Sequence, residues 1–279
     1  MSVQRQMRLS WYLLAGMILV SKASAQAPDP LPLLLKGLAS HGVTIVDLTY
    51  TLDENNPYWP EGRTQTPFKD KVAGTYERNG LFARELEIPE HFGTHIDAPV
   101  HFDPHGWKVA EIPLERLIAP AIVIDVTKEA KAQAEYRVTV EDIERWEKAH
   151  GPAPLAGIVF FRTGWGERWP SQSEFMNPDS AGHPHFPCLT VDAGRYLMKR
   201  MKPVGIGIDS PGIDRGDDHT YPLHHLTLDS GTYLLENVGN LEALPETGAV
   251  VIVSPMKLTG GSGSPVRILA LIPRQRLLK

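Results

Sequence analysis

Short apolar runs separated by turn residues recur along this chain, and they predict a protein built around one buried β-sheet. The runs at 121–126 (AIVIDV) and 158–162 (IVFFR) are nearly continuous, which is typical of strands buried on both faces. An alternating segment at 83–88 predicts a strand that we expect to pair with the one at 43–48. Further strands are predicted at 204–208, 250–253 and 266–271.

Two helices are indicated between these strands. Thr139 to Asp142 forms a capping box that opens a helix through Ala149, and Gly151-Pro152 ends it. A second helix is predicted from Thr190 to Met201. The mixed order of strands and helices predicts an α/β fold, with a mostly buried mixed β-sheet flanked by helices. No repeat or low-complexity linker divides the chain, so we expect a single domain over residues 26–279.

The N-terminus has the pattern of an export signal. Arg5 and Arg8 precede a short apolar core at 11–20, and small residues follow at 23–25. We expect residues 1–25 to be a signal peptide cut after Ala25, which predicts a periplasmic or secreted protein. The alternative is a membrane anchor, but ten apolar residues are too few, since a spanning helix needs about 20. No stable membrane insertion is expected after cleavage.

Composition and charge limit the classes of partner molecule that we expect this protein to bind. The chain has 279 residues, 42% hydrophobic and 22% charged, as in ordinary globular proteins. Its formal net charge is -5 and it has no long run of Lys and Arg, so no nucleic-acid partner is expected. With Cys188 as the single cysteine, no intrachain disulfide can form, and a buried structural thiol is expected there.

The most informative stretch is PEHFGTHIDAPVHFDP, at 89–104. His91, His95, Asp97 and His101 fall within eleven residues, and imidazole nitrogen and carboxylate oxygen are the ordinary ligands of zinc and manganese. Gly93-Thr94 predicts a tight bend that would fold His91 back beside His95 and Asp97. The alternative is a set of surface histidines in a proline-rich loop, but such a dense, apolar-flanked group favours a metal site.

The spacing also predicts where these side chains point. On an extended segment, His95, Asp97 and His101 would share one face, because side chains alternate with period 2. Pro99 cannot donate to a sheet ladder, so the segment is expected to be an edge strand or a strand exit. Three ligands from one segment leave coordination positions open for water, which indicates a catalytic site.

A second cluster lies at 211–237. Glu236 sits in an apolar run (TYLLENV), where a buried carboxylate needs a partner or a metal. His224 and His225 precede a strand-like segment that turns back to reach it. The cluster therefore offers distant ligands for a second metal ion. Its chemistry-bearing residues are Asp214, Asp217, Asp218, His219, His224, His225 and Glu236.

The segment HFGTHIDAPVHF resembles the signature of the cyclase family of metal-dependent hydrolases, which includes bacterial kynurenine formamidase and isatin hydrolase. The pattern His-x3-His-x-Asp-x-Pro-x-His is complete, and supporting features extend from Asp47 to the final strands. The resemblance implies the family's swivelling β/β/α-like fold.

The resemblance also implies roles for particular residues. His91, His95 and Asp97 would bind metal, with Asp97 bridging two ions and His101 acting as general acid/base. His224 and Glu236 match the family's second-metal pair, a His followed twelve residues later by a Glu. Substrate-binding roles are expected for Trp59, Phe102 and His225. Without the resemblance, the residues themselves leave His101 a competing role as a metal ligand.

These features predict an enzyme that hydrolyses a carbon–nitrogen bond with metal-activated water. The expected cofactor is one or two divalent ions, manganese or zinc. Trp59, Tyr58 and Phe102 flank the motif, so we expect a substrate with an aromatic or flat ring, although aromatic core packing accounts equally well for any one of them. The resemblance implies that this substrate is an aromatic amide or lactam. An isatin-like lactam is the first choice, and export disfavours the alternative, N-formylkynurenine; lactone hydrolysis is third.

Two further expectations complete the sequence-based picture. The resemblance implies a homodimer or a higher homo-oligomer. From a different class of protein, a periplasmic metal- or ligand-binding module without catalysis remains an alternative. The sequence does not indicate a serine hydrolase of the α/β type, because it has no G-x-S-x-G motif. It does not indicate a zincin protease either, because it has no H-E-x-x-H motif.

Overall fold

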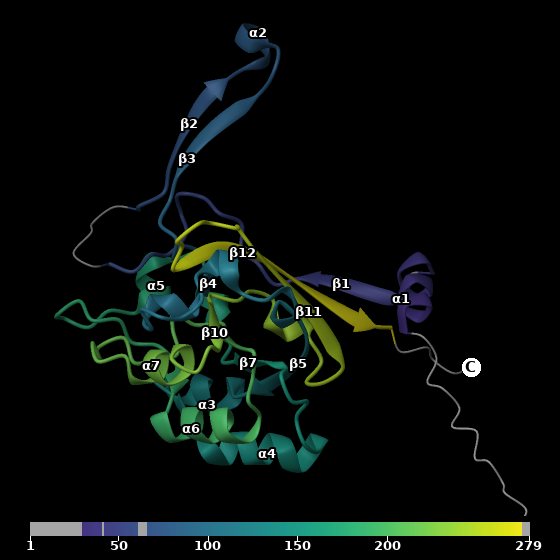
Figure 1. Ribbon diagram of the computed structural model, residues 1–279. Coiled ribbons are helices and arrows are strands. Elements are labelled where there is room, and N and C mark those ends of the chain that lie inside the picture. Colours follow the sequence, from purple (N-terminus) through teal and green to yellow (C-terminus); the bar gives the residue numbers. More distant parts are fainter. Residues whose placement is uncertain (1–29, 41, 61–65, 275–279) are drawn as a thin grey trace, which may run out of the picture.

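Eight strands form one mixed sheet that closes on itself (Figure 1). The computed structural model describes residues 30–40, 42–60 and 66–274, so the predicted signal peptide lies outside the described residues. In the order in which they neighbour one another, the strands are β1 (Val43–Asp47), β12 (Gly263–Pro273), β11 (Ala249–Pro255), β5 (Ile118–Asp125), β7 (Ile158–Arg162), β9 (Gly205–Ile208), β10 (Tyr233–Glu236) and β4 (His95–Asp97).

The long strand β12 closes the sheet. Its first residues, 263–265, pair with β4, and residues 266–271 pair with β11. Since β4 also pairs with β10, the ladder returns to its starting strand. The last part of β12, 269–273, pairs with β1, which therefore lies outside the closed ring. The strands β5, β7, β9 and β10 run parallel, and the remaining pairings are antiparallel.

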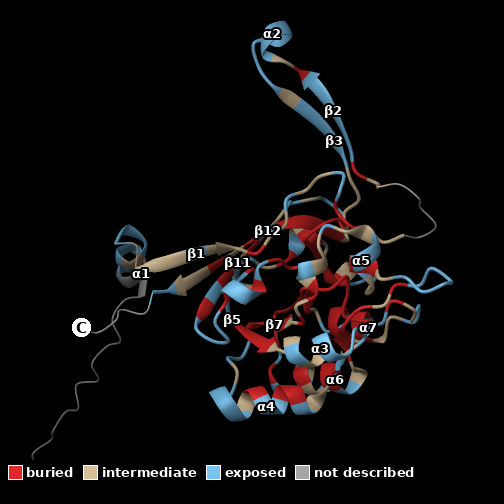
Figure 2. Ribbon diagram, turned by 180° about the vertical axis from the view of Figure 1, so that it is seen from behind, coloured by how far each residue is buried: buried red, intermediate tan, exposed pale blue. Residues whose placement is uncertain are grey.

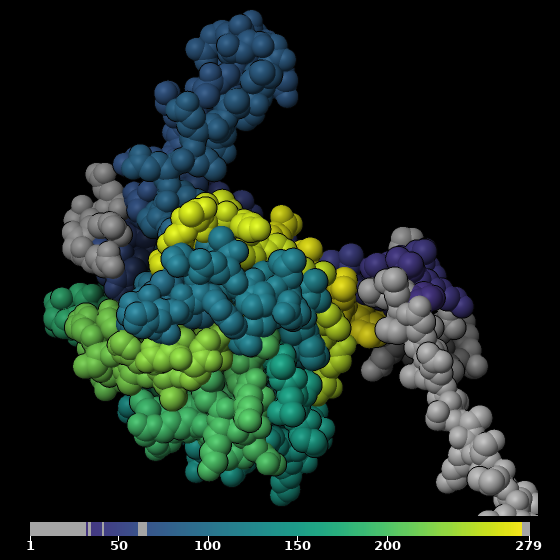
Figure 3. All heavy atoms as spheres, viewed as in Figure 1, coloured from purple at the N-terminus to yellow at the C-terminus, as the bar shows by residue number. Residues whose placement is uncertain are grey.

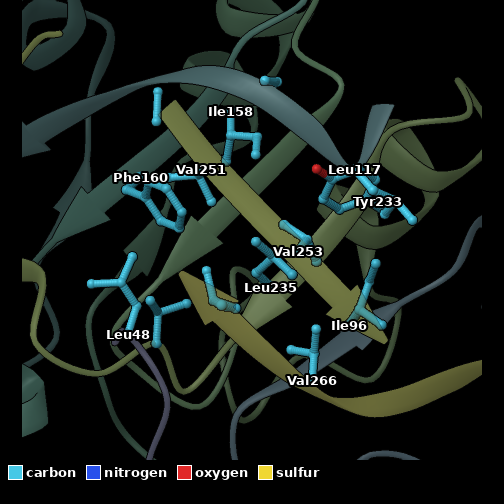
Figure 4. Packing of buried hydrophobic residues seen from close by; sticks show 14 of the residues in the cluster. Leu48, Ile96, Leu117, Ile158, Phe160, Tyr233, Leu235, Val251, Val253 and Val266 are labelled. Atoms are coloured by element: carbon cyan, nitrogen blue, oxygen red, sulfur yellow. The ribbon is translucent and has the colours of Figure 1, made fainter. Parts of the chain in front are cut away.

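The predicted apolar runs are strands whose two faces are both buried. On β7, Ile158 and Phe160 point into the closed sheet, where they belong to the same cluster as Tyr233 (Figure 4). The intervening Val159 and Phe161 belong to a second cluster, formed with residues of the helices. The period of two therefore divides each run between two cores, and neither face is left for polar side chains.

Helices cover the outer face of the parallel strands, where α3, α4 and α6 lie on one side of the sheet (Figure 1). The capping box at Thr139 is confirmed, because its side chain accepts from Asp142 N while Asp142 accepts from Thr139 N. Thr190 caps the second predicted helix in the same way, by accepting from Ala193 N. The helices are α1 (Pro30–Ala39), α2 (Tyr76–Asn79), α3 (Thr127–Ala132), α4 (Val140–His150), α5 (Gln172–Met176), α6 (Val191–Arg200) and α7 (Pro222–Leu228).

Short 3-10 helices connect several of these elements. They are η1 (Pro99–His101), η2 (Val109–Glu111), η3 (Leu114–Arg116), η4 (Trp165–Arg168) and η5 (Leu241–Ala243). A two-stranded parallel ladder joins β6 (Arg137–Val138) to β8 (Cys188–Leu189), and Cys188 is buried there as expected. No helix in the described part of the chain has the length and apolar character needed to cross a membrane.

One pairing expectation is wrong. The strand at 83–88, observed as β3 (Ala83–Glu87), pairs with β2 (Lys69–Gly74) and not with β1. Opposite charges pair across this ribbon: Lys69 lies directly opposite Glu87, and Arg84 pairs diagonally with Asp70. Such cross-strand pairs favour this register. Strand β2 was missed because its residues KDKVAG carry little apolar pattern.

The β2–β3 hairpin stands away from the body, with α2 at its tip (Figures 1 and 3). It is exposed along almost its whole length (Figure 2). The remaining architecture confirms the predicted α/β fold, with a mostly buried mixed sheet flanked by helices. Closure of that sheet into a ring was not foreseen.

Candidate active site

The bend predicted before β4 is present. Gly93 has φ 64°, a left-handed conformation that glycine adopts at little cost. The bend returns His91 to β4, so that its Nδ1 lies 2.6 Å from Oδ1 of Asp97. A Cβ atom on Gly263 would lie 2.5 Å from Cε1 of His91. Glycine at 263 therefore makes room for the returning imidazole.

The predicted position of this segment needs two corrections. Strand β4 is not an edge strand, because it pairs with both β10 and β12. The strand ends at Asp97, and Pro99 opens η1, so His101 lies on a 3-10 turn instead of the predicted extended face. Proline supplies the reason for the turn, since it cannot donate to the ladder and its φ suits a helical start. His101 nevertheless returns to the site, where its ring stacks on His91 with centroids 4.0 Å apart.

The second cluster reaches the same place from α7 and β10. Glu236 ends β10 and pairs in register with His95 on β4. His224 lies on α7, a helix not predicted from the sequence, and its Nε2 is 3.5 Å from Asp97 Oδ2 and 3.4 Å from Glu236 Oε1. The structure thus brings together all six residues predicted to bind metal or carry a proton: His91, His95, Asp97, His101, His224 and Glu236.

The tautomers of His95 and His224 follow from the hydrogen bonds that their Nδ1 atoms make, on the side of each ring away from the carboxylates. Nδ1 of His95 lies 2.9 Å from the carbonyl oxygen of Gly93, which can only accept, so Nδ1 carries the proton. Nδ1 of His224 likewise donates to Asp214 at 2.7 Å. In the neutral rings, each Nε2 therefore presents its lone pair to the carboxylates.

The imidazole of His91 is held by two hydrogen-bonded side chains, Ser262 and Glu90. The hydroxyl of Ser262 donates to Oε2 of Glu90 at 2.8 Å. Its oxygen is then left to accept from Nε2 of His91, 3.0 Å away. The proton of neutral His91 is thus on Nε2, and the Nδ1 lone pair faces Asp97 at 2.6 Å.

This arrangement fits a cation. Three imidazole lone pairs face the carboxylate oxygens of Asp97 and Glu236, which is repulsive unless a proton or metal ion lies between them. Oε1 of Glu236 is buried and has no hydrogen-bond partner among the described residues. Nitrogen and carboxylate donors of this kind suit zinc and manganese equally.

Two candidate ligand groups share Asp97. One contains His91, Asp97 and His101, and the other contains His95, Asp97 and Glu236; within each, the ligand atoms lie within 4.8 Å of one another. The predicted grouping placed His95 with His91 and gave His101 the role of general acid/base, with metal binding as its competing role. The observed distances keep both roles of His101 open.

Burial and neighbouring charges act on the pKa values of several residues in the site. Burial would raise the pKa of Asp97, but the surrounding His91, His224 and His95 hold it well below its usual value. Burial would lower the pKa of His95, but Asp97 and Glu236 raise it to about 9. The pKa of His224 is also raised, through Asp214, Asp97 and Glu236, although burial opposes the shift. Without an ion, protons balance the carboxylates, so a metal ion would bind by displacing them.

His101 differs from these histidines. Its pKa is lowered below the ordinary 6.5, because packing against its neighbours removes hydration and His91 and His224 add repulsion. The ring still has access to solvent from the cavity. A neutral imidazole that reaches both the site and solvent is suited to accept and release a proton.

A cavity of about 290 Å³ opens over these residues. Its lining also includes an aromatic wall formed by Tyr58, Trp59, Phe102, Phe175 and Phe186. Trp59 packs edge-on against Phe186 with ring centroids 6.1 Å apart. Two of the three predicted substrate-binding residues, Trp59 and Phe102, therefore line the cavity.

His225 does not line this cavity. Its side chain is about half exposed and lies 3.8 Å from Asp229 on the same helix. Its ring packs against Phe102, which does line the cavity, with ring centroids 5.0 Å apart. Its predicted contact with substrate remains a prediction.

Several residues that organise the site were not assigned a role from the sequence. Asp214 was noted as acidic, but its bond to His224 depends on a helix that was not predicted. Ser262 lies in a glycine-serine run (GGSGS, 260–264), a composition typical of a flexible turn. Asn237 donates to the carbonyl of Gly93 at 2.8 Å and so supports the acceptor of His95. The sequence signal that could have identified Asn237 is its position, as a polar residue directly after Glu236 in an apolar run.

Comparisons with known proteins found similar sequences and similar structures. The sequence profile of the Cyclase family matches residues 46–215. The chain is 35% identical to isatin hydrolase of Roseibium aggregatum, over 85% of this chain and 95% of that protein. It is 30% identical to kynurenine formamidase of Bacillus cereus, over 80% of this chain and 94% of that protein. The structure of isatin hydrolase A from Labrenzia aggregata bound to benzyl benzoate superposes with a TM-score of 0.81, at 36% identity, covering 88% of this chain and all of that one.

Proposed function

Because this chain belongs to the cyclase family, we propose that it is a metal-dependent hydrolase that opens an isatin-like lactam with water as the nucleophile. The sequence-based resemblance to this family is thereby confirmed. The observation that carries the proposal is the set of three imidazole lone pairs directed at Asp97 and Glu236, because such an array requires a positive charge at its centre. The relative with 35% identity, named an isatin hydrolase, supports the substrate.

The residues that would hold metal are His91, His95, Asp97, His224 and Glu236. One or two divalent ions, manganese or zinc, would lower the pKa of water to about 7 and polarise a carbonyl oxygen. Asp97 lies in both candidate ligand groups, so it would be shared if two ions bind. Asp214, Ser262 and Gly93 keep the ligand imidazoles in the required tautomers.

His101 would move the proton. Its lowered pKa keeps the ring neutral near pH 7, so it can take a proton from water as the carbonyl is attacked. It can then return that proton to the leaving nitrogen, which opens the lactam ring. The aromatic wall around Trp59 would hold the flat body of the substrate while its carbonyl faces the ligand residues.

The second candidate is hydrolysis of an aryl formamide such as N-formylkynurenine. It is favoured by the relative named kynurenine formamidase, which is 30% identical over 228 residues. Both reactions break an amide carbon–nitrogen bond and need the same proton transfer. Lactone hydrolysis is third. A binding module without catalysis is the alternative from another class, and the open cavity beside His101 disfavours it.

Location and assembly complete the proposal. The export signal predicted from the sequence of residues 1–25 favours a periplasmic or secreted protein. A homodimer is supported by the β2–β3 hairpin, which exposes Leu81, Phe82 and Leu86 to more than half of their full extent. An isolated two-stranded hairpin is marginally stable in water, so a second copy that covers this surface would stabilise it.

A direct assay tests the proposed reaction. The protein is loaded with manganese or with zinc, and kcat/KM is measured on isatin, N-formylkynurenine and an aryl lactone. We expect isatin to give the highest value. Preference for N-formylkynurenine would select the second candidate, and tight metal binding with no turnover of any substrate would favour the binding module.

A further inference from the structure

Among its described lining residues, the cavity above the candidate ligands contains one Lys or Arg side chain, Arg215. The rest of the lining consists mainly of the candidate metal site and the aromatic wall. About half of the Arg215 side chain is exposed. Because Arg215 lines the cavity, its guanidinium can supply a strong and directional donor for anions beside an aromatic wall suited to neutral rings.

The backbone on both sides of Arg215 is anchored. Asp214 accepts hydrogen bonds from the amides of Leu223 and His224, both at 2.9 Å. Gly216 packs so closely against Pro184 that a Cβ atom there would overlap the proline carbonyl. The main chain at Arg215 is therefore held in place, and the starting point of its side chain is fixed relative to His224.

The guanidinium is also held, and most of its donors remain available. Nη2 lies 2.5 Å from Oδ2 of Asp217, and this is the one side-chain hydrogen bond of Arg215 to the described residues. Arg215 lines both the catalytic cavity and a smaller neighbouring one of about 110 Å³, whereas Asp217 lines only the smaller one. The neutralising carboxylate thus lies toward the smaller cavity. A guanidinium has five N–H donors, enough for Asp217 and a second carboxylate.

We propose that Arg215 is a specificity-determining residue that selects substrates bearing a carboxylate on the part of the molecule remote from the attacked carbonyl. The substrate class would then be an isatin-like aryl lactam with an anionic substituent. The aromatic body would lie against Trp59, the carbonyl at the candidate metal site, and the carboxylate at Arg215. This inference rests on the proposed function and narrows its substrate.

The test compares matched neutral and anionic substrates. We would measure kcat/KM of the metal-loaded protein for isatin and for isatin carboxylates substituted at ring positions 5 and 6. The variants are Arg215→Gln, which removes the charge, and Arg215→Lys, which keeps it. Arg195→Gln is the control, because Arg195 also pairs with an aspartate, Asp192, but lines neither cavity.

For Arg215→Gln we expect a loss of ~10–100-fold in kcat/KM on at least one isatin carboxylate, mainly through KM, and a change of less than about 3-fold on isatin. Arg215→Lys should recover part of the loss, and Arg195→Gln should match the wild type. Equal effects of Arg215→Gln on neutral and anionic substrates would overturn the inference while leaving the proposed function intact.

Calorimetry keeps the inference testable if the reaction itself is wrong. Binding of the isatin carboxylates and of isatin to wild-type and Arg215→Gln protein requires no turnover. Tighter binding of a carboxylate that is lost in Arg215→Gln would support the anion contact even without hydrolysis. No preference of the wild type for any carboxylate would overturn it.

Discussion

Asp214 accepts a hydrogen bond of 2.7 Å from Nδ1 of His224, and the same carboxylate accepts from the backbone amide of that histidine. This pair links a loop to the first turn of α7 and directs Nε2 of His224 toward Asp97 and Glu236. A carboxylate behind a ligand histidine fixes both its tautomer and its orientation.

Replacing Asp214 should therefore weaken metal binding. For Asp214→Asn we expect metal affinity to fall by ~10–100-fold, because an amide cannot replace all the acceptor positions of the carboxylate. Metal titration measures the effect. Asp229→Asn is the matched control, since Asp229 is an exposed aspartate at the end of the same helix. Unchanged affinity in Asp214→Asn would show that His224 does not depend on this bond.

Removing the imidazole of His101 separates its two possible roles. For His101→Ala we expect unchanged metal content and a fall in kcat of ~100–10,000-fold, because a proton carrier is lost but the remaining ligands stay. Metal analysis and kinetics are done on the same preparation. Loss of metal in this variant would instead identify His101 as a ligand, as its distance from His91 and Asp97 permits.

Adding a methyl group at Gly263 should disturb the site without altering a functional group. The new Cβ would lie 2.5 Å from Cε1 of His91 and 2.7 Å from the carbonyl oxygen of Ile96. For Gly263→Ala we expect destabilisation by ~1–3 kcal/mol and reduced metal content, because the backbone and His91 must shift. Urea unfolding and metal analysis measure the two effects. Wild-type values for both would contradict the tight packing at this glycine.

Asp142 provides a pH-dependent test of the fold. It accepts from the hydroxyl of Tyr136 at 2.7 Å and from the amide of Thr139 at 2.9 Å, and it pairs with Arg145 at 2.7 Å. Although burial opposes the shift, these donors lower the pKa of Asp142 below its usual 3.8. The folded protein thus releases this proton more readily than the unfolded chain, and the stabilisation is full above pH 3.8 and is lost as the pH falls below it.

For Asp142→Asn we expect a loss of ~1–3 kcal/mol in the free energy of unfolding near pH 7. The difference from the wild type should shrink as the pH falls below about 4. Urea unfolding at several pH values measures this, with Glu144→Gln, an exposed change on the same helix, as control. A difference that is the same at pH 3 and pH 7 would contradict the assigned ionisation.

The sequence predicted most of the buried strands, because each has a strong local pattern. Both faces of β5 and β7 are buried, so their apolar runs leave little ambiguity. The hairpin partner of β3 was missed because KDKVAG is stabilised by cross-strand charges, and these become visible only once the register is known. Closure of the sheet depends on β12, whose opposite edges pair with different strands along its length.

The candidate site could be predicted only in part. His91, His95 and Asp97 are close in sequence, and one glycine bend brings them together. His101 was expected on an extended face, but Pro99 starts a 3-10 turn that changes its direction. The residues that orient the imidazoles come from distant loops and helices. Ser262 is separated by 171 residues from His91, and no local pattern records such a contact.

The central claim is that a cation held by this cluster is required for amide hydrolysis, and metal depletion with reconstitution tests it most directly. Protein treated with a chelator, shown metal-free by elemental analysis and folded by circular dichroism, is assayed on isatin before and after addition of manganese or zinc. We expect turnover to disappear with the metal and to return in proportion to the ion restored. Folded, metal-free protein that hydrolyses isatin at the original rate would contradict the account.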